Sequence, residues 1–218
     1  MALAIFDLDH TLLDGDSDHA WGQYLVDRGL VDAEHHQQRN DFFYEQYQAG
    51  TLNIHEFLAF ALQPLTRYPR EHMEEERKRF LAERITPLIS QKSRDLLQQH
   101  REQGDELLII TATNGFVTFP IAEMLGVEHI IAPIPEIMND QYTGRIIGIP
   151  SFQGGKVTRL EQWLQEQHTD LVGSYFYSDS HNDLPLLRVV DHPVVVNPDP
   201  TLQRVAEEQQ WPIISLRD

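Results

Sequence analysis

The sequence of 218 residues contains no cysteine. This absence excludes disulfide bonds and thiolate chemistry, and we expect a protein of a reducing compartment, the cytoplasm. Long hydrophobic runs are also missing, since no apolar stretch approaches the roughly 20 residues that cross a bilayer. Met1 leads into an apolar run that carries Asp7 and Asp9, without the basic segment that opens a signal peptide. We therefore expect no membrane anchor.

Positive charge is scarce as well. Lys and Arg number 17 against 34 Asp and Glu, and the formal net charge at pH 7 is −17. Nucleic-acid phosphates and anionic membranes would repel such a surface, so we expect no nucleic acid and no membrane as partners. What the chain does have is 41% hydrophobic residues, enough for a substantial core. Its length suits one large domain or a core with an insertion.

Strand and helix patterns divide the chain into two parts. Residues 3–8 form a short, mostly apolar run, and after Gly104 strand-like runs alternate with helical ones. Such alternation predicts an α/β fold, with a Rossmann-like, mostly parallel sheet and helices on both faces. Residues 17–85 break the alternation, with apolar residues at helical spacing among many charges. We predict a core of residues 1–16 and 86–218, and an inserted α-helical cap of residues 17–85.

Local signals place several individual elements. Thr86 is expected as the N-cap of a helix that ends at Gly104. Residues 137–149 are typical of a hairpin, because Asn139-Asp140 stands between apolar β-forming residues. The other strands are expected at 106–110, 128–132, 171–177 and 193–196, and the other helices of the core at 116–125, 157–167 and 183–189.

Polar residues follow three of the predicted strands. They are Asp7-Leu8-Asp9, Thr111-Ala112-Thr113-Asn114, and the run from Ser178 to Asp183. In a parallel sheet, ligands bind beyond the carboxyl ends of the strands, and Lys156 is the cation expected to join these residues. Each pattern alone is more often a turn or a cap, but their joint position at strand ends indicates one site.

This combination fits Mg²⁺-assisted phosphoryl transfer. Mg²⁺ prefers oxygen ligands and binds through a few carboxylates plus substrate phosphate, so Asp7 and Asp179 would be ligands, with Asp183 steadying the shell. A carboxylate can act as nucleophile and form an aspartyl-phosphate, while a second carboxylate protonates the leaving oxygen. Thr111, the main chain at 112–113 and Lys156 would face the phosphoryl group.

Four motifs, in order, resemble those of the haloacid dehalogenase-like hydrolases. The closest branch is the phosphoserine-phosphatase-like one, subfamily IB, which has a helical cap after the first strand. The motifs are Asp7-Leu8-Asp9-His10-Thr11, the strand Leu107–Ile110 with Thr111, Lys156, and Ser178-Asp179-Ser180-His181-Asn182-Asp183.

The resemblance implies a role for each matched residue. Asp7 would be the nucleophile and a Mg²⁺ ligand, and Asp9 the general acid/base that also offers its main-chain carbonyl to the metal. Thr111 and Lys156 would hold the phosphoryl oxygens. The remaining implied roles are metal binding by Asp179 and Asp183, and substrate binding by Ala112, Thr113, Asn114 and Asn182.

The second motif departs from the pattern of phosphoserine phosphatases. It continues as Ala112-Thr113-Asn114, where those enzymes have Ser-Gly-Gly, and this puts phosphoserine in doubt as the substrate. A phosphoserine site would also need a cation for the substrate carboxylate, for which Arg39 and Arg67 are the candidates.

The segment from Asp14 to Trp21 bears on the leaving group. Three carboxylates and an indole at the cap entrance favour a cationic or aromatic leaving group. The alternative is that Asp14 to Asp18 form only a loop and a helix N-cap. On the first interpretation Asp16 and Asp18 bind the substrate. That substrate is a small phosphomonoester with an amine or imidazolium, such as an amino-alcohol phosphate; histidinol phosphate is one candidate.

Other functions share these motifs. The alternatives are a phosphoserine phosphatase, a phosphotransferase of the same fold, or a catalytically silent relative that binds a phosphorylated ligand. The intact set of acidic residues with Lys156 disfavours the silent relative. Dehalogenation has no use for Asp9. The partner expected in every case is a small molecule, and the oligomeric state stays open.

Overall fold

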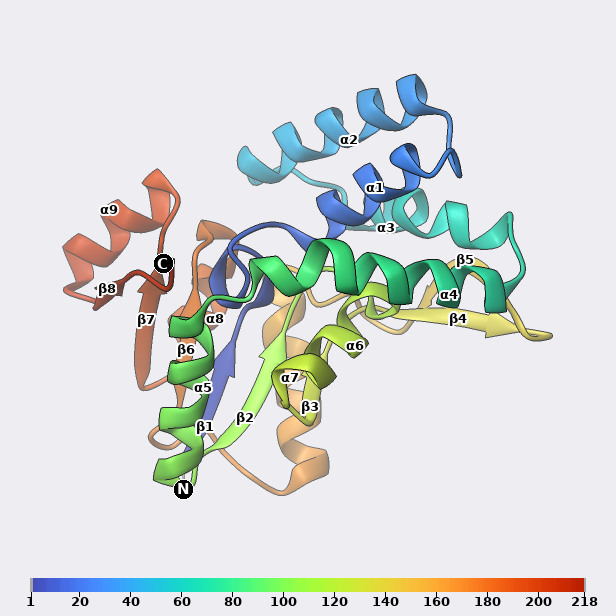
Figure 1. Ribbon diagram of the computed structural model, residues 1–218. Helices are drawn as coiled ribbons and strands as arrows, with labels where there is room; N and C mark the ends of the chain where they lie inside the picture. Colours follow the sequence, from blue (N-terminus) through green and yellow to red (C-terminus); the bar gives the residue numbers. More distant parts are fainter. Residues whose placement is uncertain (1, 218) are drawn as a thin grey trace.

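The computed structural model describes residues 2–217, so residues 1 and 218 of the predicted core range lie outside the described residues. Its centre is a six-stranded sheet in the order β3-β2-β1-β6-β7-β8, with every neighbouring pair parallel (Figure 1). The predicted α/β fold with a mostly parallel sheet is confirmed. The strands are β1 (Leu3–Phe6), β2 (Glu106–Ile110), β3 (His129–Ile131), β6 (Tyr175–Ser178), β7 (His192–Val196) and β8 (Ile213–Ile214).

Helices cover both faces of the sheet. Side chains of β1 alternate between the two faces, as in any strand. Ala4 and Phe6 belong to the hydrophobic cluster of α5 and α6, whereas Leu3 and Ile5 belong to the cluster of α7, α8 and α9. Because both faces are buried, the strand is apolar throughout. The helices are α5 (Gln91–Gln103), α6 (Gly115–Leu125), α7 (Gly154–Gln167), α8 (Leu184–Leu187) and α9 (Pro200–Gln209).

Four further helices form a layer beyond the carboxyl ends of β1 and β2 (Figure 1). Trp21 joins this helical layer to the core, because its ring lies 5.5 Å from that of Phe116 in α6 and 5.1 Å from that of Phe80. Aromatic pairs at such distances add to the apolar area buried. The members of the layer are α1 (Ser17–Asp27), α2 (Ala33–Gln48), α3 (Ile54–Leu62) and α4 (Arg70–Phe80).

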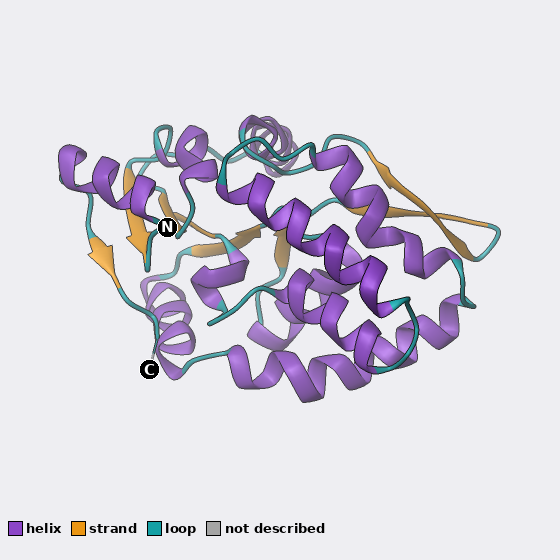
Figure 2. Cartoon of the chain, turned by 90° about the horizontal axis from the view of Figure 1, so that it is seen from above, coloured by secondary structure: helices purple, strands orange, loops and turns teal. Residues whose placement is uncertain are grey.

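A hairpin outside the main sheet packs beside the helical layer. Its strands are β4 (Ile134–Met138) and β5 (Gln141–Ile147), paired antiparallel. Asn139 and Asp140 join them with φ of 50° and 62°, values that a two-residue turn of type I′ requires. The expected turn is thus confirmed, although the first strand begins three residues before the predicted start. Figure 2 shows the hairpin projecting past the sheet.

Several boundaries in the core differ from the expectation: β6 begins at Tyr175 and not at residue 171, and α7 begins at Gly154 and not at residue 157. Thr86 opens only a short 3₁₀ turn, Thr86–Leu88, and the N-cap of α5 is Ser90, whose side chain accepts a hydrogen bond from the main chain of Ser93. The chain cannot stay helical in between, because Ile89 is extended and bridges Leu13. The helix α9 and the strand β8 were not predicted. Within residues 2–217, none of the helices has the length and apolar character that a membrane span requires.

Candidate active site

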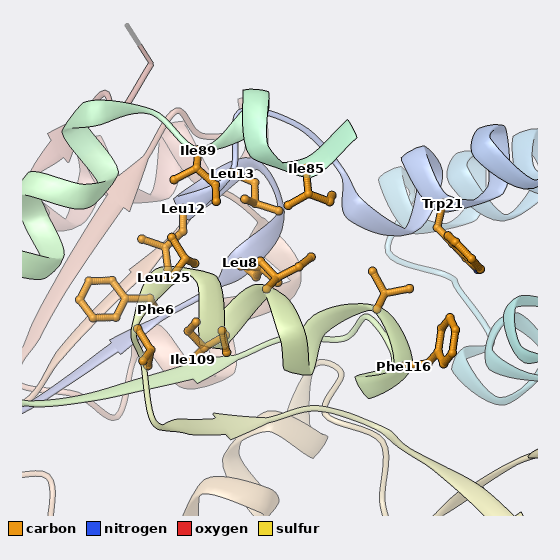
Figure 3. Packing of buried hydrophobic residues seen from close by; sticks show 14 of the residues in the cluster. Phe6, Leu8, Leu12, Leu13, Trp21, Ile85, Ile89, Ile109, Phe116 and Leu125 are labelled. Atoms are coloured by element: carbon orange, nitrogen blue, oxygen red, sulfur yellow. The ribbon is translucent and has the colours of Figure 1, made fainter. Parts of the chain in front are cut away.

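A tight turn after β1 carries Asp7 and Asp9 at the carboxyl end of the sheet. The turn spans Leu8–Leu12, and His10 takes a left-handed conformation within it, with φ of 56°. Figure 3 shows the buried side chains that pack this turn against the core, among them Leu8, Leu12, Leu13, Ile85, Ile89 and Ile109. Strand β1 ends two residues earlier than expected, so both aspartates are free to face the space beyond the sheet.

Lys156 joins two of the predicted carboxylates. From the first turn of α7, its Nζ donates to Oδ1 of Asp7 at 2.8 Å and to Oδ2 of Asp183 at 2.7 Å. Ser178 donates its hydroxyl to the same oxygen of Asp183 at 2.7 Å. Burial raises the pKa of Asp7 to about 7, although Lys156 opposes the rise. Burial disfavours the charged form of Lys156, but the attraction of Asp183 and Asp7 prevails and raises its pKa.

Asp9 is held from two sides. The main-chain N–H of Ser17, at the start of α1, donates to its Oδ1 at 2.7 Å, and the Thr113 hydroxyl donates to its Oδ2 at 2.8 Å. Burial, followed by the charge of Asp16, raises the pKa of Asp9 to about 6. A carboxyl group with such a pKa can exchange a proton near neutral pH. Thr113 therefore positions Asp9, in addition to lining the cavity described below.

The loop after β2 closes another side of the site. Thr111 is buried, and its hydroxyl oxygen accepts a hydrogen bond from the main chain of Thr113 at 3.1 Å. Its carbonyl accepts from the Ser151 hydroxyl at 2.6 Å, which ties this loop to the segment before α7. Thr111, Ala112 and Thr113 line the same cavity as Asp7.

Asp179 lies near Asp7 and Asp183. Burial, with the charges of Asp7 and Asp183, holds its pKa well above the usual range. The Thr11 hydroxyl donates to its Oδ1 at 3.3 Å. In the described chain, no group of three His, Asp or Glu side chains is already arranged as a metal cage. Two buried carboxylates, Asp7 and Asp183, and the half-buried Asp179 share one lysine, and this leaves an excess of negative charge that a divalent cation would neutralise.

Two cavities meet at this point. The main cavity is lined by Asp7 and Asp9, and among residues 2–217 its only Lys or Arg is Lys156. Helices α2 and α3 supply an apolar and aromatic wall that includes Phe43, Tyr44 and Phe57. The second cavity adjoins Asp179, Ser180 and His181. The residues that line both are Tyr44, Tyr47, His10 and Asp16.

The two acidic residues predicted to bind the substrate do line the main cavity. Asp16 is also the N-cap of α1, and its Oδ1 accepts from the main chain of Asp18 and His19 at 2.9 Å. The Asp18 side chain accepts a long hydrogen bond from the Asn114 amide nitrogen, at 3.4 Å. Burial and the charges of Asp16 and Asp9 hold the pKa of Asp18 well above the usual range. The N-cap interpretation is therefore confirmed for Asp16, and substrate binding by Asp16 and Asp18, which line the cavity, stays a prediction.

Asp14 and Trp21, the other residues expected at the cap entrance, lie away from the main cavity. Asp14 is exposed and pairs with Arg217 at 2.9 Å, and Trp21 is buried between the helical layer and the core. Neither lines the main cavity. Arg39 lies over the Phe42 and Phe43 rings, and Arg67 lines a separate cavity between α2 and α3. Neither candidate cation for a substrate carboxylate reaches the main cavity.

The two predicted amide residues serve different contacts. Asn182 lines the main cavity, but its Nδ2 donates to the carbonyl of Tyr47 at 3.2 Å, and its Oδ1 accepts from Gln153 at 2.9 Å. Asn114 is buried behind Asp18, and its Oδ1 has no hydrogen-bond partner among the described residues. Asn182 thus links the core to the helical layer.

Sequence reasoning missed the aromatic wall of the main cavity, including Tyr47, and it missed Gln153, which binds Asn182 beside the cavity. Tyr47 follows Phe43 by one helical turn, and this aromatic face of α2 was the available signal. Gln153 carries no signal, since a glutamine before Gly-Gly has no special pattern.

Comparison with known proteins agrees with this geometry. Residues 4–188 match the family of haloacid dehalogenase-like hydrolases. A Neisseria meningitidis protein named histidinol-phosphatase is 49% identical, over 99% of both chains. A Mycobacterium tuberculosis protein named phosphoserine phosphatase is 30% identical over 99% of this chain and 71% of its own length.

Solved structures give the same fold. A Bordetella pertussis protein of unknown function has a TM-score of 0.93 and 41% identity, with 99% of each chain covered. A substrate-bound phosphoserine phosphatase has a TM-score of 0.72 at 17% identity, covering 98% of this chain and 92% of its own, and so supports the fold alone. The resemblance drawn from the motifs is confirmed, and with it the expected enzyme class, a phosphomonoester hydrolase.

Proposed function

Because this chain belongs to the haloacid dehalogenase-like hydrolases, we propose that it is a Mg²⁺-dependent phosphatase of a small aminated phosphomonoester. Histidinol phosphate is the first candidate. The reaction runs through an aspartyl-phosphate on Asp7, in the cytoplasm, and residues 17–85 act as the cap.

In the first step a carboxylate oxygen of Asp7 attacks phosphorus, and the bond between phosphorus and the ester oxygen breaks. Asp9 gives its proton to the departing alkoxide. In the second step water attacks the same phosphorus, Asp9 takes the proton of that water, and phosphate leaves Asp7 free. The hydrogen bond from Lys156 to Asp7 and the raised pKa of Asp9 support these roles.

The phosphoryl group spreads negative charge over its oxygens, so donors must surround it. Lys156 and the Thr111 hydroxyl are suited to hold those oxygens, because both residues line the main cavity beside Asp7. Asp7, Asp179, Asp183 and the main-chain carbonyl of Asp9 would hold Mg²⁺. When bound, the metal neutralises the carboxylates and the phosphoryl charge.

One observation carries the choice of substrate: the only Lys or Arg that lines the main cavity, within residues 2–217, is Lys156. Asp7 and Asp183 already bind this lysine. A substrate carboxylate would find no further Lys or Arg among the described residues of this lining, and an unpaired buried charge is strongly disfavoured. Asp18 and the aromatic wall of α2 and α3 instead suit a protonated nitrogen or an imidazole ring. The Neisseria relative named histidinol-phosphatase supports the same choice.

The test is a panel of phosphomonoesters assayed with Mg²⁺. It contains histidinol phosphate and ethanolamine phosphate, which carry an amine and no carboxylate, phosphoserine, which carries both, and glucose 6-phosphate, which carries only hydroxyls besides its phosphate. We expect kcat/KM for histidinol phosphate to exceed that for phosphoserine by about 100-fold or more, since a missing partner for a buried charge costs that much. If phosphoserine or glucose 6-phosphate is turned over faster than both histidinol phosphate and ethanolamine phosphate, the substrate assignment is wrong.

A further inference from the structure

Tyr47, in the last turn of α2, stands between the two cavities of the site. It lines the main cavity together with Asp7 and Lys156, and the second cavity together with Asp179 and Ser180. The helical layer thereby places Tyr47, together with Tyr44, at the junction of the two cavities, between Asp7 and Asp179. In Figure 1 the C-terminal end of α2 lies on the side of the layer toward β6 and β7, in agreement with this position.

Two core loops donate hydrogen bonds to the main chain at the C-terminal end of α2. Asn182 donates its Nδ2 to the carbonyl of Tyr47 at 3.2 Å, and Gln153 donates its Nε2 to the carbonyl of Gly50 at 3.3 Å. Gln153 also donates to Oδ1 of Asn182 at 2.9 Å, so the two contacts form one connected unit. Gln153 and Asn182 are close in sequence to Lys156 and Asp183. Their hydrogen bonds therefore fix the position of the helical layer relative to these two residues.

Gln153 adopts an unusual backbone conformation to make these contacts. Its φ and ψ are 48° and −123°, in a region that strongly favours glycine. A side chain is kept there although glycine would fit the backbone better. Its amide is what reaches both Gly50 and Asn182, so the contact to the helical layer is a reason for retaining a side chain at this position.

The phenol of Tyr47 lies near the carboxylates of Asp179, Asp7 and Asp183. Burial, followed by the charges of Asp179, Asp7 and Asp183, holds its pKa well above the usual range, although a hydrogen bond with the Ser180 side chain opposes the rise. A phenol is protonated at neutral pH in any case, so Tyr47 brings an O–H donor to a place where the nearby carboxylates only accept. A bound phosphoryl group presents further acceptor oxygens at the same place.

We propose that the Tyr47 hydroxyl donates a hydrogen bond to a phosphoryl oxygen of the bound substrate, on the side that faces Asp179. Asn182 and Gln153 are the positioning residues that hold Tyr47 there. The inference rests on the proposed phosphoryl chemistry at Asp7, but not on the identity of the leaving group. It assigns to the helical layer a part in phosphoryl recognition beyond its role in selecting the alcohol.

The decisive variant is Tyr47→Phe, which removes the hydroxyl and keeps the ring. We expect kcat to fall about 10- to 100-fold, as for a lost hydrogen bond to a charged group, with p-nitrophenyl phosphate and histidinol phosphate alike. Orthovanadate mimics the transferring phosphoryl group, and its Kd with Mg²⁺, measured by calorimetry, should rise by a similar factor. KM should change much less, by about threefold or under.

Tyr68→Phe is the matched control. The Tyr68 hydroxyl donates to the carbonyl of Leu30 at 2.9 Å within the same helical layer, and Tyr68 lines neither cavity. This variant should keep kcat and the vanadate Kd within about twofold of the wild type. An equal loss in both variants would mean that Tyr47 merely stabilises the layer, and the inference would be wrong.

Gln153→Ala tests the positioning unit. It should lower kcat in the same direction as Tyr47→Phe, and the double variant should lose little more than Tyr47→Phe alone, because both act through one hydroxyl. Fully multiplicative losses would contradict the coupling. Unchanged vanadate binding in Tyr47→Phe overturns the proposal even if the wild type turns over none of the panel. Failure of the whole panel with normal vanadate effects would instead overturn the proposed reaction.

Discussion

Lys156 donates a hydrogen bond to Asp7 over 2.8 Å, and both side chains are almost fully buried. The ammonium group also binds Asp183, so one cation serves two carboxylates. Lys156 opposes the rise that burial causes in the pKa of Asp7 and so favours the anion, which is the form that attacks phosphorus. The same lysine lies where the phosphoryl oxygens of a substrate would arrive.

Lys156→Met should therefore impair both activity and stability. We expect kcat to fall about 100- to 1000-fold, since a positioned cation is lost from the reacting centre. The free energy of unfolding, measured by urea titration without metal, should fall by about 3–5 kcal/mol, because two buried carboxylates lose their partner. Lys78→Met is the control, since the Lys78 side chain is 73% exposed, and it should alter neither quantity. Normal turnover in Lys156→Met would refute the role of the lysine.

Asp9→Asn should reveal general acid catalysis through the leaving group. A poor leaving group such as the alcohol of histidinol phosphate needs a proton, whereas p-nitrophenolate leaves without one. We expect kcat to fall by about 1000-fold or more with histidinol phosphate. With p-nitrophenyl phosphate, the rate of the p-nitrophenolate burst should fall by a factor that is about ten times smaller, or less. Thr113→Val, which removes a hydrogen bond to Asp9, should show the same trend more weakly. An equal loss with both substrates would argue that Asp9 has only a structural part.

Asp18→Asn tests the acidic side of the main cavity. Removing its charge should lower kcat/KM for histidinol phosphate about 10- to 100-fold, mostly through KM, because a charge-assisted contact to the amine is lost. The loss with p-nitrophenyl phosphate, which has no amine, should be much smaller. Asp14→Asn is the matched control, because Asp14 pairs with Arg217 on the surface, and it should leave both substrates unaffected. If the KM for histidinol phosphate is unchanged in Asp18→Asn, Asp18 does not bind the amine.

The carboxylate cluster should make the metal-free protein more stable in mild acid than at neutral pH. Burial raises the pKa of Asp7 to about 7 and of Asp9 to about 6, above the ordinary value of 3.8. Between about pH 4 and pH 7 the folded state therefore binds more protons than the unfolded state, and the free energy of unfolding falls as pH rises. We expect the Tm without metal to be lower at about pH 7.5 than at about pH 5.5. Added Mg²⁺ should raise the Tm at the higher pH, through binding to the folded state.

Calorimetry at the two pH values, with chelator or with Mg²⁺, checks this expectation. Asp7→Asn removes one charge of the cluster and should reduce the difference between the two pH values. The expectation is contradicted if the Tm in chelator is higher at the higher pH, or if Mg²⁺ leaves the Tm unchanged at both pH values. Either result would mean that the carboxylate cluster does not destabilise the metal-free protein at neutral pH.

The sequence was most informative where the strand order of a parallel sheet decides which residues meet. Asp7, Thr111 and Asp183 follow parallel strands whose carboxyl ends lie at one edge, so their convergence could be predicted from the strand pattern alone. Lys156 was predictable for the same reason, since the first turn of α7 lies at this edge. The direction of helix side chains was harder, because adjacency in sequence does not tell which face of a helix meets the core. Trp21, expected at the cap entrance, packs instead on Phe116.

Apart from Asp18, the residues that the helical layer brings to the core site were not predicted. Tyr47 reaches the site only because the helical layer lies beyond the carboxyl ends of the strands, and no local pattern encodes that placement. Gln153 is a further case, because its strained backbone depends on acceptors in Gly50 and Asn182 that are distant in sequence. The N-cap of α5 is Ser90 and not Thr86 because a long-range bridge from Ile89 to Leu13 overrides the local signal.

Trapping the covalent intermediate on Asp7 tests the central claim most directly. The enzyme is quenched in acid during turnover of histidinol phosphate, reduced with borohydride, digested and examined by mass spectrometry. An aspartyl-phosphate is reduced to homoserine, so we expect homoserine at position 7, unmodified Asp9, and neither product in enzyme quenched without substrate. Unmodified Asp7 during steady turnover, together with retained activity in Asp7→Asn, would contradict the assignment of Asp7 as the nucleophile.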